Sequence, residues 1–347
     1  METKVIKIKE KSDPLALLPA AKILQQGGLV AFPTETVYGL GANGLDGDAV
    51  RSIYAAKGRP SDNPLILHVA DFSEFDKLAI DISDTARKMI EAFCPGPITL
   101  ILKRQRFVPD AVTGGLDTVG IRMPNHEVAR ALIRLAGVPL AAPSANTSGR
   151  PSPTNAEAVL ADLEGKIGAV IDGGNCAFGL ESTIVDCTGE VPTVLRPGAV
   201  TMEMLSAVVG EVKLDPGLTG ENSVPKAPGM KYTHYAPKAP MVMLEGAKDK
   251  IAEGLFEEIA KARAKGKKIG VIVSKEVADM MPKDIVTVVY GSRENIAEIA
   301  TNLYRALRSF DQMQVDIIFA EGTEHTGLGL AVMNRMHKAS GYRIINL

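Results

Sequence analysis

The chain has 347 residues, more than one typical domain holds, so two domains are expected. Hydrophobic residues make up 46% of it and charged residues 23%, a composition that indicates a globular protein and excludes a disordered or fibrous one. A formal net charge of -2 excludes the binding of polyanions through bulk charge, so recognition of phosphate or nucleic acid requires locally placed Lys and Arg.

Cysteine usage and the apolar pattern predict a cytoplasmic protein without a membrane partner. Cys94, Cys176 and Cys187 are an odd number, lie far apart and form no CxxC pair, so they indicate neither a disulfide framework nor a zinc knuckle. We expect them to be small core residues in a reducing compartment. The N-terminus lacks the apolar segment of a secretory signal, and no apolar run approaches the ~18 residues of a membrane span.

Helices and strands alternate along the first part of the chain, which predicts the α/β or mixed α+β class. Pro14 opens a helix that Gly27 and Gly28 end, and "LVAF" then predicts a strand. The segment "DAVRSIYAAKG" predicts a helix that ends at Gly58, and "PLILHVA" predicts a strand buried on both faces. Further strands are expected at "ITLILK", "TVGIRM", "VPLAA", "GAVID", "STIVD" and "TVLR".

A change of pattern divides the chain. Thr154 and Glu157 have the spacing of a capping box, which predicts that "NAEAVLADL" begins a helix of the first unit. From Lys213 to Pro240 the periodicity disappears and Pro and Gly are frequent, which predicts a linker or a functional loop. Strands such as "KIGVIV" then alternate with helices and indicate a small βα domain. The predicted domains are residues 1–212, a linker or active-site loop at 213–240, and residues 241–347.

Several nucleotide and metal motifs are missing. There is no GxxxxGK[ST], and neither "GLGANG" nor "GLGLAV" has the GxGxxG arrangement, so a P-loop and a Rossmann fingerprint are excluded. There is no HExxH, DxDxDG or GxSxG, and the five histidines are scattered. We therefore expect neither a dedicated metal site nor a serine-hydrolase triad.

Two cations directly after a helix form the first candidate site. In "KGRPSDNPL", Lys57 supplies a mobile point charge and Arg59 a planar fork, a pairing that suits phosphate or carboxylate oxygens. The alternative is a solvated helix C-terminus, where the dipole favours cations. Asn63 and the prolines around it stiffen the backbone that leads into the next strand, which weakens this alternative.

The second candidate is "LAAPSANTSGRPSPT", a loop of hydroxyls and amides that follows a strand, where ligands bind in α/β folds. Ser144 and Asn146 can donate hydrogen bonds to phosphates or to a base edge. An ordinary turn-rich loop, in which Asn and Ser bond their own backbone, is an equal alternative.

Arg122, in an otherwise apolar strand, is the third candidate. A buried Arg requires a partner, and a bound anion would supply one, whereas on an edge strand with a solvent face Arg122 would need none. Ser182 and Arg196 at strand ends add weaker signals, and "FPTETVYGLGA" adds hydroxyls at Thr36 and Tyr38. Together these residues predict a pocket for a nucleotide or another polyanion beside a small polar ligand.

Seven strings carry a resemblance to a known family, in the order "PTETVYGLGA", "AKGRPSDNPLILHV", "PGPITLIL", "VGIRMPNH", "APSANTSGRPSPT", "GLESTIVD" and "LRPGA". They resemble the YrdC/Sua5 family of threonylcarbamoyl-AMP synthases. "PGMKYTHYAPKAP" and the βα domain after it are similar to the additional part of the longer Sua5 form. The resemblance implies an α/β protein: a YrdC-like twisted mixed-sheet domain with helices, a linker, and a smaller Rossmann-like α/β Sua5 domain.

The family's activity would be that of a nucleotidyltransferase. L-threonine, bicarbonate and ATP would give threonylcarbamoyl-AMP, pyrophosphate and water, and a tRNA threonylcarbamoyl-transfer complex would use the product to form t6A at position 37 of tRNA. Mg²⁺ would accompany ATP, held mainly by phosphate oxygens and water without a dedicated protein cage.

The family pattern also implies residue roles. The catalytic KxR and SxN signature falls on Lys57, Arg59, Ser144 and Asn146. Threonine would be held by Thr36, His68, Arg122 and Ser182. The nucleotide would contact Arg59, Asn63, Thr118, Ala142, Ser144, Ser152, Arg196 and Tyr235.

Alternatives remain at three levels. His68 at the end of a buried strand is otherwise a packed core histidine, and the loop around Tyr235 either covers the nucleotide or is a passive tether. For the whole protein, the alternative is a YrdC-type module that binds RNA or tRNA without turnover. The related carbamoyl-transfer enzyme of hydrogenase maturation is excluded, because three scattered cysteines cannot supply its zinc fingers.

Overall fold

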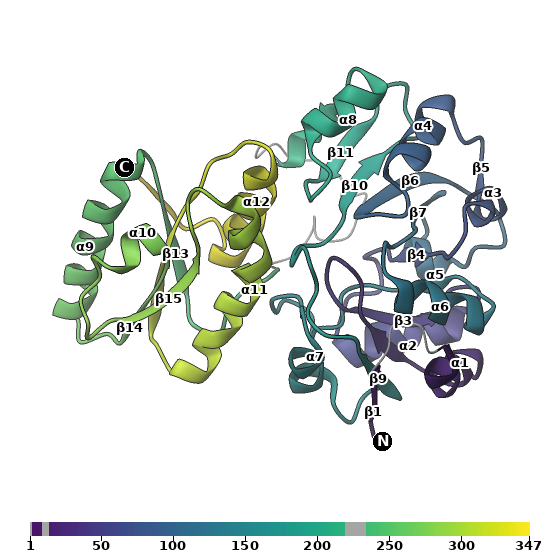
Figure 1. Ribbon diagram of the computed structural model, residues 1–347, viewed down its shortest axis with the longest axis horizontal. Coiled ribbons are helices and arrows are strands. Elements are labelled where there is room, and N and C mark those ends of the chain that lie inside the picture. Colours follow the sequence, from purple (N-terminus) through teal and green to yellow (C-terminus); the bar gives the residue numbers. More distant parts are fainter. Residues whose placement is uncertain (1, 9–13, 219–233) are drawn as a thin grey trace. The chain divides into compact units, whose positions relative to one another are not determined.

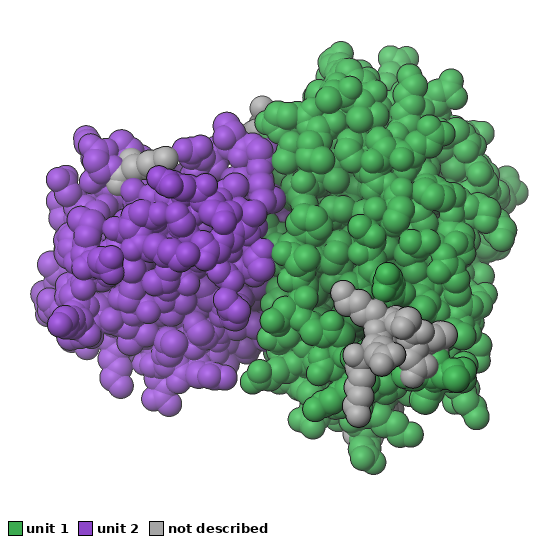
Figure 2. Space-filling model, viewed as in Figure 1, with its two compact units in different colours: residues 1–148, 152–231 green, residues 149–151, 232–347 purple. Residues whose placement is uncertain are grey.

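A computed structural model describes residues 2–8, 14–218 and 234–347 of the chain. Two compact units are present, Met1–Ser148 with Ser152–Lys231 and Gly149–Pro151 with Tyr232–Leu347 (Figure 2). Both combine helices with a sheet, which confirms the predicted α/β class. Within the described residues, no helix is both long and apolar enough to cross a membrane.

The first unit is built on one large mixed sheet with the strand order β1-β9-β2-β3-β8-β4-β7-β6-β10-β11-β12, and β5 pairs with β6 (Figure 1). Its strands are β1 (Lys4–Lys7), β2 (Val30–Phe32), β3 (Gly39–Asn43), β4 (Ile66–His68), β5 (Ala79–Ile80), β6 (Ile98–Arg104), β7 (Thr118–Arg122), β8 (Leu140–Ala141), β9 (Ala169–Asp172), β10 (Thr183–Asp186), β11 (Thr193–Arg196) and β12 (Lys213–Leu214). Its helices are η1 (Pro14–Leu17), α1 (Leu18–Gln25), α2 (Gly47–Lys57), α3 (Ser73–Leu78), α4 (Asp84–Phe93), α5 (Asp110–Thr113), α6 (Glu127–Ala136), α7 (Ala156–Leu163), α8 (Met202–Val209) and η2 (Pro216–Leu218).

The segment 213–240, predicted as a linker, begins with residues of the first unit's sheet, because β12 pairs with β11. Residues 219–233, the greater part of that segment, lie outside the described residues.

Helix α2 shows how local signals place a functional residue. Asp46 caps its start, since Asp46 Oδ1 accepts hydrogen bonds from the backbone N–H groups of Asp48 at 2.9 Å and Ala49 at 3.3 Å. Its end is Gly58, as predicted, in the left-handed conformation with φ 62°. Lys57 is therefore the last helical residue.

The predicted capping box at the start of α7 is wrong by one residue. Asn155, not Thr154, is the N-cap, and its Oδ1 accepts from the N–H of Ala158 at 2.9 Å. Thr and Asn are both good N-cap residues. The sequence favoured Thr154 because Glu157 follows it at the three-residue spacing of a capping box.

Both faces of the first unit's sheet are covered by apolar core residues, and the apolar clusters on the two faces differ in size. Alternate residues of β2 show the two sides: Val30 and Phe32 pack with α1 and α6, and Ala31 packs in the larger cluster on the other side. Around β4, β6, β10 and β11 the larger cluster fills one face. Among the described residues, the apolar cluster on the opposite face consists of Ile66, Ile101, Ile184 and Leu195.

The three cysteines are buried in this core and are free thiols, as predicted. Burial raises the pKa of each thiol to about 12.

The second unit has a parallel sheet with the order β15-β14-β16-β13-β17. Its elements are β13 (Met241–Glu245), α9 (Lys248–Ala264), β14 (Ile269–Ser274), α10 (Lys275–Ala278), β15 (Val286–Gly291), α11 (Ile296–Met313), β16 (Ile317–Glu321), α12 (Leu328–Ser340) and β17 (Ile344–Asn346). The connections after β13 and β14 lead to strands nearer the β15 edge of the sheet. The connections after β15 and β16 lead to strands nearer the β17 edge. Right-handed crossovers therefore place α9 and α10 on one face and α11 with α12 on the other (Figure 1).

We expect Gly58→Ala to destabilise the protein by about 1–2 kcal/mol, because an L-residue is disfavoured in the left-handed conformation at the end of α2. The matched control is Gly47→Ala at the start of the same helix, where an added Cβ would meet only the flexible Arg51 side chain at 3.4 Å. Urea denaturation of both variants, followed by far-ultraviolet circular dichroism, measures the difference. Equal midpoints for the two variants would contradict this account of the helix end.

Candidate active site

One face of the first unit's sheet gathers the polar residues of neighbouring strands. β4 pairs in parallel with β7, so that Ile66 lies opposite Gly120 and His68 opposite Arg122. Side chains alternate between the two faces of a strand, so His68, Arg122 and Thr118 share a face. This is the face with the small apolar cluster, since the intervening residues of both strands belong to the larger core.

Arg122 is buried on this face and forms an ion pair with Glu35. The side chains are 5% and 7% exposed, and Arg122 Nη2 lies 2.9 Å from Glu35 Oε2. Within the described residues, Arg122 Nε and Glu35 Oε1 are buried without a hydrogen-bond partner. The edge-strand alternative for Arg122 is wrong, because β7 lies between β4 and β6. Glu35 is absent from the sequence-based predictions, although a buried Arg requires a counter-charge.

The turn Thr34–Thr36 between β2 and β3 positions Glu35. Thr34 Oγ1 donates to the carbonyl of Val37 at 2.6 Å and accepts from the N–H of Thr36 at 3.1 Å. Thr36 Oγ1 lies 2.8 Å from Thr34 Oγ1 and is fully buried. Because the Thr34 proton is used toward Val37, Thr36 donates in this contact, and its hydroxyl keeps its capacity to accept.

His68 ends β4 and is 4% exposed. Its Nδ1 lies 3.2 Å from the carbonyl of Ile66, and its ring meets the Phe32 ring edge-on, with centroids 5.9 Å apart. Burial, and next the positive charge of Arg122, lowers the pKa of His68 to about 3. The imidazole is therefore neutral at physiological pH and can bind a hydroxyl or a carboxylate without adding charge.

Ser182 and Arg196 are joined at the start of β10 and the end of β11. Ser182 Oγ lies 2.8 Å from Thr99 Oγ1. Arg196 donates two hydrogen bonds to Ser182, from Nη2 to the hydroxyl at 3.2 Å and from Nε to the carbonyl at 3.0 Å. The β10 register places Ile184 beside both Thr99 and Arg196. These polar residues therefore belong to the same face as Arg122.

Lys57 connects the end of α2 to the loop after β8. It is 2% exposed, and its ammonium donates to the carbonyl of Ser144 at 2.5 Å and to that of Asn146. The loop is also held by β3 and the residue before it, since the N–H of Leu40 donates to the carbonyl of Pro143 and the N–H of Ala145 donates to the carbonyl of Tyr38, each at 2.8 Å. The structure thus brings three residues of the KxR and SxN signature into contact.

Other predicted nucleotide contacts lie toward the amino ends of β4 and β7. Arg59 Nη2 donates to the carbonyls of Asn63 at 3.4 Å and Pro64 at 3.2 Å, and Asn63 is buried. Thr118 opens β7, about 13 Å along the strand from Arg122. Ala142 donates its N–H to the carbonyl of Ile66 at 2.9 Å, which directs the Ser144 loop toward the same end.

Two further predicted nucleotide contacts are Ser152 and Tyr235. Ser152 is buried and its hydroxyl donates to Glu181 at 2.5 Å. Tyr235 belongs to the second unit, where its ring lies 5.5 Å from that of His234 and 5.2 Å from that of Tyr304. The role of Tyr235 in the site stays a prediction.

The candidate site is therefore rich in cations and in neutral donors. Lys57, Arg59, Arg122 and Arg196 supply fixed positive charge, and the hydroxyls and amides around them supply directional hydrogen bonds. Within the described residues, the cluster of histidine and carboxylate groups spaced for a metal ion lies in the second unit. The donor set of the candidate site suits anionic substrates.

Comparison with known proteins identifies the family to which this chain belongs. Residues 22–198 match the family model described as "Telomere recombination", and residues 200–341 match that of the "Threonylcarbamoyl-AMP synthase, C-terminal domain". A threonylcarbamoyl-AMP synthase of Pyrococcus abyssi is 49% identical over 99% of this chain and 100% of its own length. The chain belongs to the YrdC/Sua5 family.

A second YrdC/Sua5 sequence and a solved structure support the same assignment. A threonylcarbamoyl-AMP synthase of Bacillus subtilis is 48% identical over 96% of this chain and 95% of its own. The crystal structure of P. abyssi Sua5 complexed with L-threonine has a TM-score of 0.94 and 48% identity, covering 99% of this chain and 100% of that one. The predicted family and fold are confirmed.

We expect His68 to stay neutral between pH 8 and pH 5. The pKa of His68 is about 3 in the folded protein and 6.5 in an exposed histidine. As the pH falls, His68 is therefore protonated in the unfolded chain before it is protonated in the folded protein. The resulting loss of stability, about 1.4 kcal/mol per pH unit, runs from pH 6.5 down to pH 3. NMR of ¹³C-labelled histidine, assigned with a His68→Asn variant, checks the protonation state. A His68 resonance that titrates near pH 6.5 would show that the side chain is accessible to water.

Proposed function

We propose that this protein synthesises threonylcarbamoyl-AMP and pyrophosphate from L-threonine, bicarbonate and ATP in the cytoplasm. The observation that carries the proposal is the buried polar face on which Arg122 and Glu35 keep hydrogen-bonding atoms without partners in the described structure, beside a neutral His68. Polar atoms buried in this way cost free energy unless a ligand satisfies them.

Threonine would bind at the end of the face that carries Arg122. The guanidinium can bind the substrate carboxylate, and the neutral His68 and the accepting hydroxyl of Thr36 can bind the threonine hydroxyl. Ser182, held between Thr99 and Arg196, would complete this group. The complex of P. abyssi Sua5 with L-threonine supports this choice of substrate.

ATP would lie along the Lys57–Ser144–Asn146 group and the Arg59 turn. Threonine and bicarbonate condense to a carbamate with loss of water. A carbamate oxygen then bonds to the α-phosphorus while the bond to the β-phosphate oxygen breaks, and pyrophosphate leaves with that electron pair. Both reactants are anionic, so Lys57 and Arg59 lower the barrier by neutralising charge that is pushed together.

The remaining nucleotide contacts of the proposal are Asn63, Thr118, Ala142, Ser152, Arg196 and Tyr235. Mg²⁺ would bind to the phosphate oxygens and water and neutralise part of the triphosphate charge. The residues of the KxR and SxN group fit this form of binding, since they offer hydroxyl, amide and carbonyl oxygens and no carboxylate. The product would pass to a tRNA threonylcarbamoyl-transfer complex for t6A37 formation.

Lys57→Met and Arg59→Gln should each lower kcat/KM for pyrophosphate release by about 100-fold, the usual size of a lost electrostatic contact in a transition state. Lys88→Met, an exposed lysine on α4, is the matched control and should keep wild-type turnover. The assay supplies threonine, bicarbonate and ATP together and omits each in turn. Turnover independent of threonine or bicarbonate would refute the proposed reaction. Salt-dependent tRNA binding without any turnover would favour the RNA-binding alternative.

Arg122→Gln should weaken threonine binding by about 100-fold, equivalent to about 3 kcal/mol for charge-assisted hydrogen bonds. The single variant also leaves Glu35 as an uncompensated buried carboxylate and should lose about 3–5 kcal/mol of stability. Glu35→Gln with Arg122→Gln removes both charges and should recover most of that stability without recovering threonine binding. Calorimetric titration with threonine and urea denaturation separate the two effects. Wild-type threonine affinity in the double variant would remove Arg122 from the binding site.

A further inference from the structure

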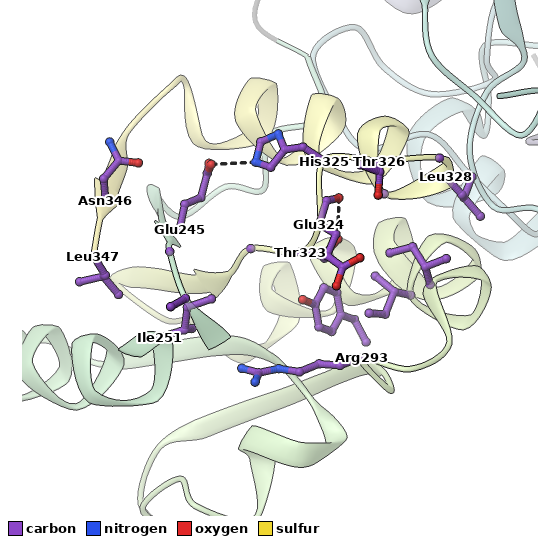
Figure 3. A pocket seen from close by; sticks show the side chains of 18 residues that line it. Glu245, Ile251, Arg293, Thr323, Glu324, His325, Thr326, Leu328, Asn346 and Leu347 are labelled. Atoms are coloured by element: carbon purple, nitrogen blue, oxygen red, sulfur yellow. Dashed lines mark hydrogen bonds and ion pairs between the residues drawn. The ribbon is translucent and has the colours of Figure 1, made fainter. Parts of the chain in front are cut away.

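The second unit contains a cavity at the point where its sheet changes direction. The connections that leave β13 and β16 run to opposite edges of the sheet, and these two strands are neighbours. Parallel α/β sheets bind ligands outside the carboxyl ends of strands at such a switch point. A cavity of about 740 Å³ lies there, and its lining includes Glu245 at the end of β13 and Gly322 directly after β16 (Figure 3).

Three side chains of the types that ligate metals, one carboxylate and two imidazoles, meet beside this cavity. Glu245 comes from the end of β13, His325 from the loop before α12, and His337 from the last turns of α12. His325 Nε2 lies 3.0 Å from Glu245 Oε2, and His337 Nε2 lies 2.5 Å from Glu245 Oε1. Glu245 and His325 both line the cavity, and Figure 3 shows them directed toward each other.

The geometry is that of a convergent donor set. Both imidazoles direct the same ring nitrogen, Nε2, at the same carboxylate, and the three donor atoms lie within 4.8 Å of one another. Around a tetrahedral ion bound at about 2.0–2.2 Å, donor atoms are about 3.4 Å apart. Small side-chain rotations are therefore enough to direct all three donors at one ion, which would replace the protons that the imidazoles share with the carboxylate.

The composition of the cluster selects the kind of ion. Two imidazoles and one carboxylate suit Zn²⁺ and related transition metals, whereas Mg²⁺ and Ca²⁺ require mostly oxygen ligands. Exposure also lets an ion reach the cluster, since the side chains of Glu245, His337 and His325 are 16%, 22% and 50% exposed. A His₂Glu set leaves one tetrahedral position for water or for an oxygen of a ligand in the cavity.

We propose that Glu245, His325 and His337 form a Zn²⁺ site at the edge of the second unit's cavity. The ion ties the end of β13 to both ends of the segment 325–337, so it stabilises the second unit as well as offering an open coordination position. This site is independent of the reaction proposed for the first unit, and its test needs no substrate.

The test is a titration of the metal-free full chain with Zn²⁺ in competition with a chromophoric chelator. We expect one Zn²⁺ per chain, and a loss of at least about 100-fold in affinity in His325→Ala, His337→Ala and Glu245→Gln, because even outer-shell changes cost about 10- to 100-fold. The matched control is His126→Ala, a histidine of the first unit, which should bind Zn²⁺ like the wild type. If His337→Ala does not fold, the half-exposed His325 and the isosteric Glu245→Gln still decide the question.

A second measurement reports the geometry. Co²⁺ in place of Zn²⁺ should give the intense visible absorption of a four-coordinate site, and Zn²⁺ should raise the thermal midpoint of the wild type but not of the three variants. Zn²⁺ binding that the three variants leave unchanged would overturn the proposal, as would the absence of stoichiometric binding by the wild type.

Discussion

A guanidinium buried inside a sheet needs a counter-charge, and the first unit's site depends on how Arg122 obtains one. Arg122 lies on β7 between two other strands, and Glu35 supplies the charge from the turn after β2. Hydroxyl contacts within Thr34–Thr36 hold that turn, and the chain continues directly into β3. The backbone of Tyr38 and Leu40 then binds the loop that carries Ser144 and Asn146. The acid that neutralises Arg122 and the loop that Lys57 joins are therefore positioned by one continuous segment.

The two faces of the same sheet differ in composition and in what they contribute to the protein. One face of β4 and β7 belongs to a large apolar core that supplies stability, and the other combines a small apolar cluster with buried charge. A buried ion pair contributes little stability compared with apolar side chains of the same volume, and removal of one partner is costly. Such a face persists because the opposite face stabilises the sheet, and its unsatisfied polar atoms are the expected cost of a preorganised binding site.

Local sequence signals predicted what is local. Gly58 identified the end of α2 and so the position of Lys57. The strand pattern around Arg122 left open whether this side chain is buried or faces solvent on an edge strand, and the sheet order decided for burial. Glu35 was not predicted as the partner of Arg122, because the two residues are 87 positions apart in the sequence and only the sheet order brings them together. The histidines show the same limit, since their scatter along the sequence gave no sign that His325 and His337 converge on Glu245 in the fold. The residue roles came from family resemblance, and geometry now gives several of them a physical reason.

The histidines also show how a neighbouring charge decides what an imidazole can bind. Burial, and next the positive charge of Arg122 on the paired strand, lowers the pKa of His68, and the same positive charge opposes the approach of a metal cation. His325 and His337 flank a carboxylate instead, which attracts a cation between them. The first unit's site thus favours anions held by guanidinium, ammonium and neutral donors. The second unit's cluster favours a cation, so the proposed Zn²⁺ site and the proposed adenylation site would bind ligands of opposite charge.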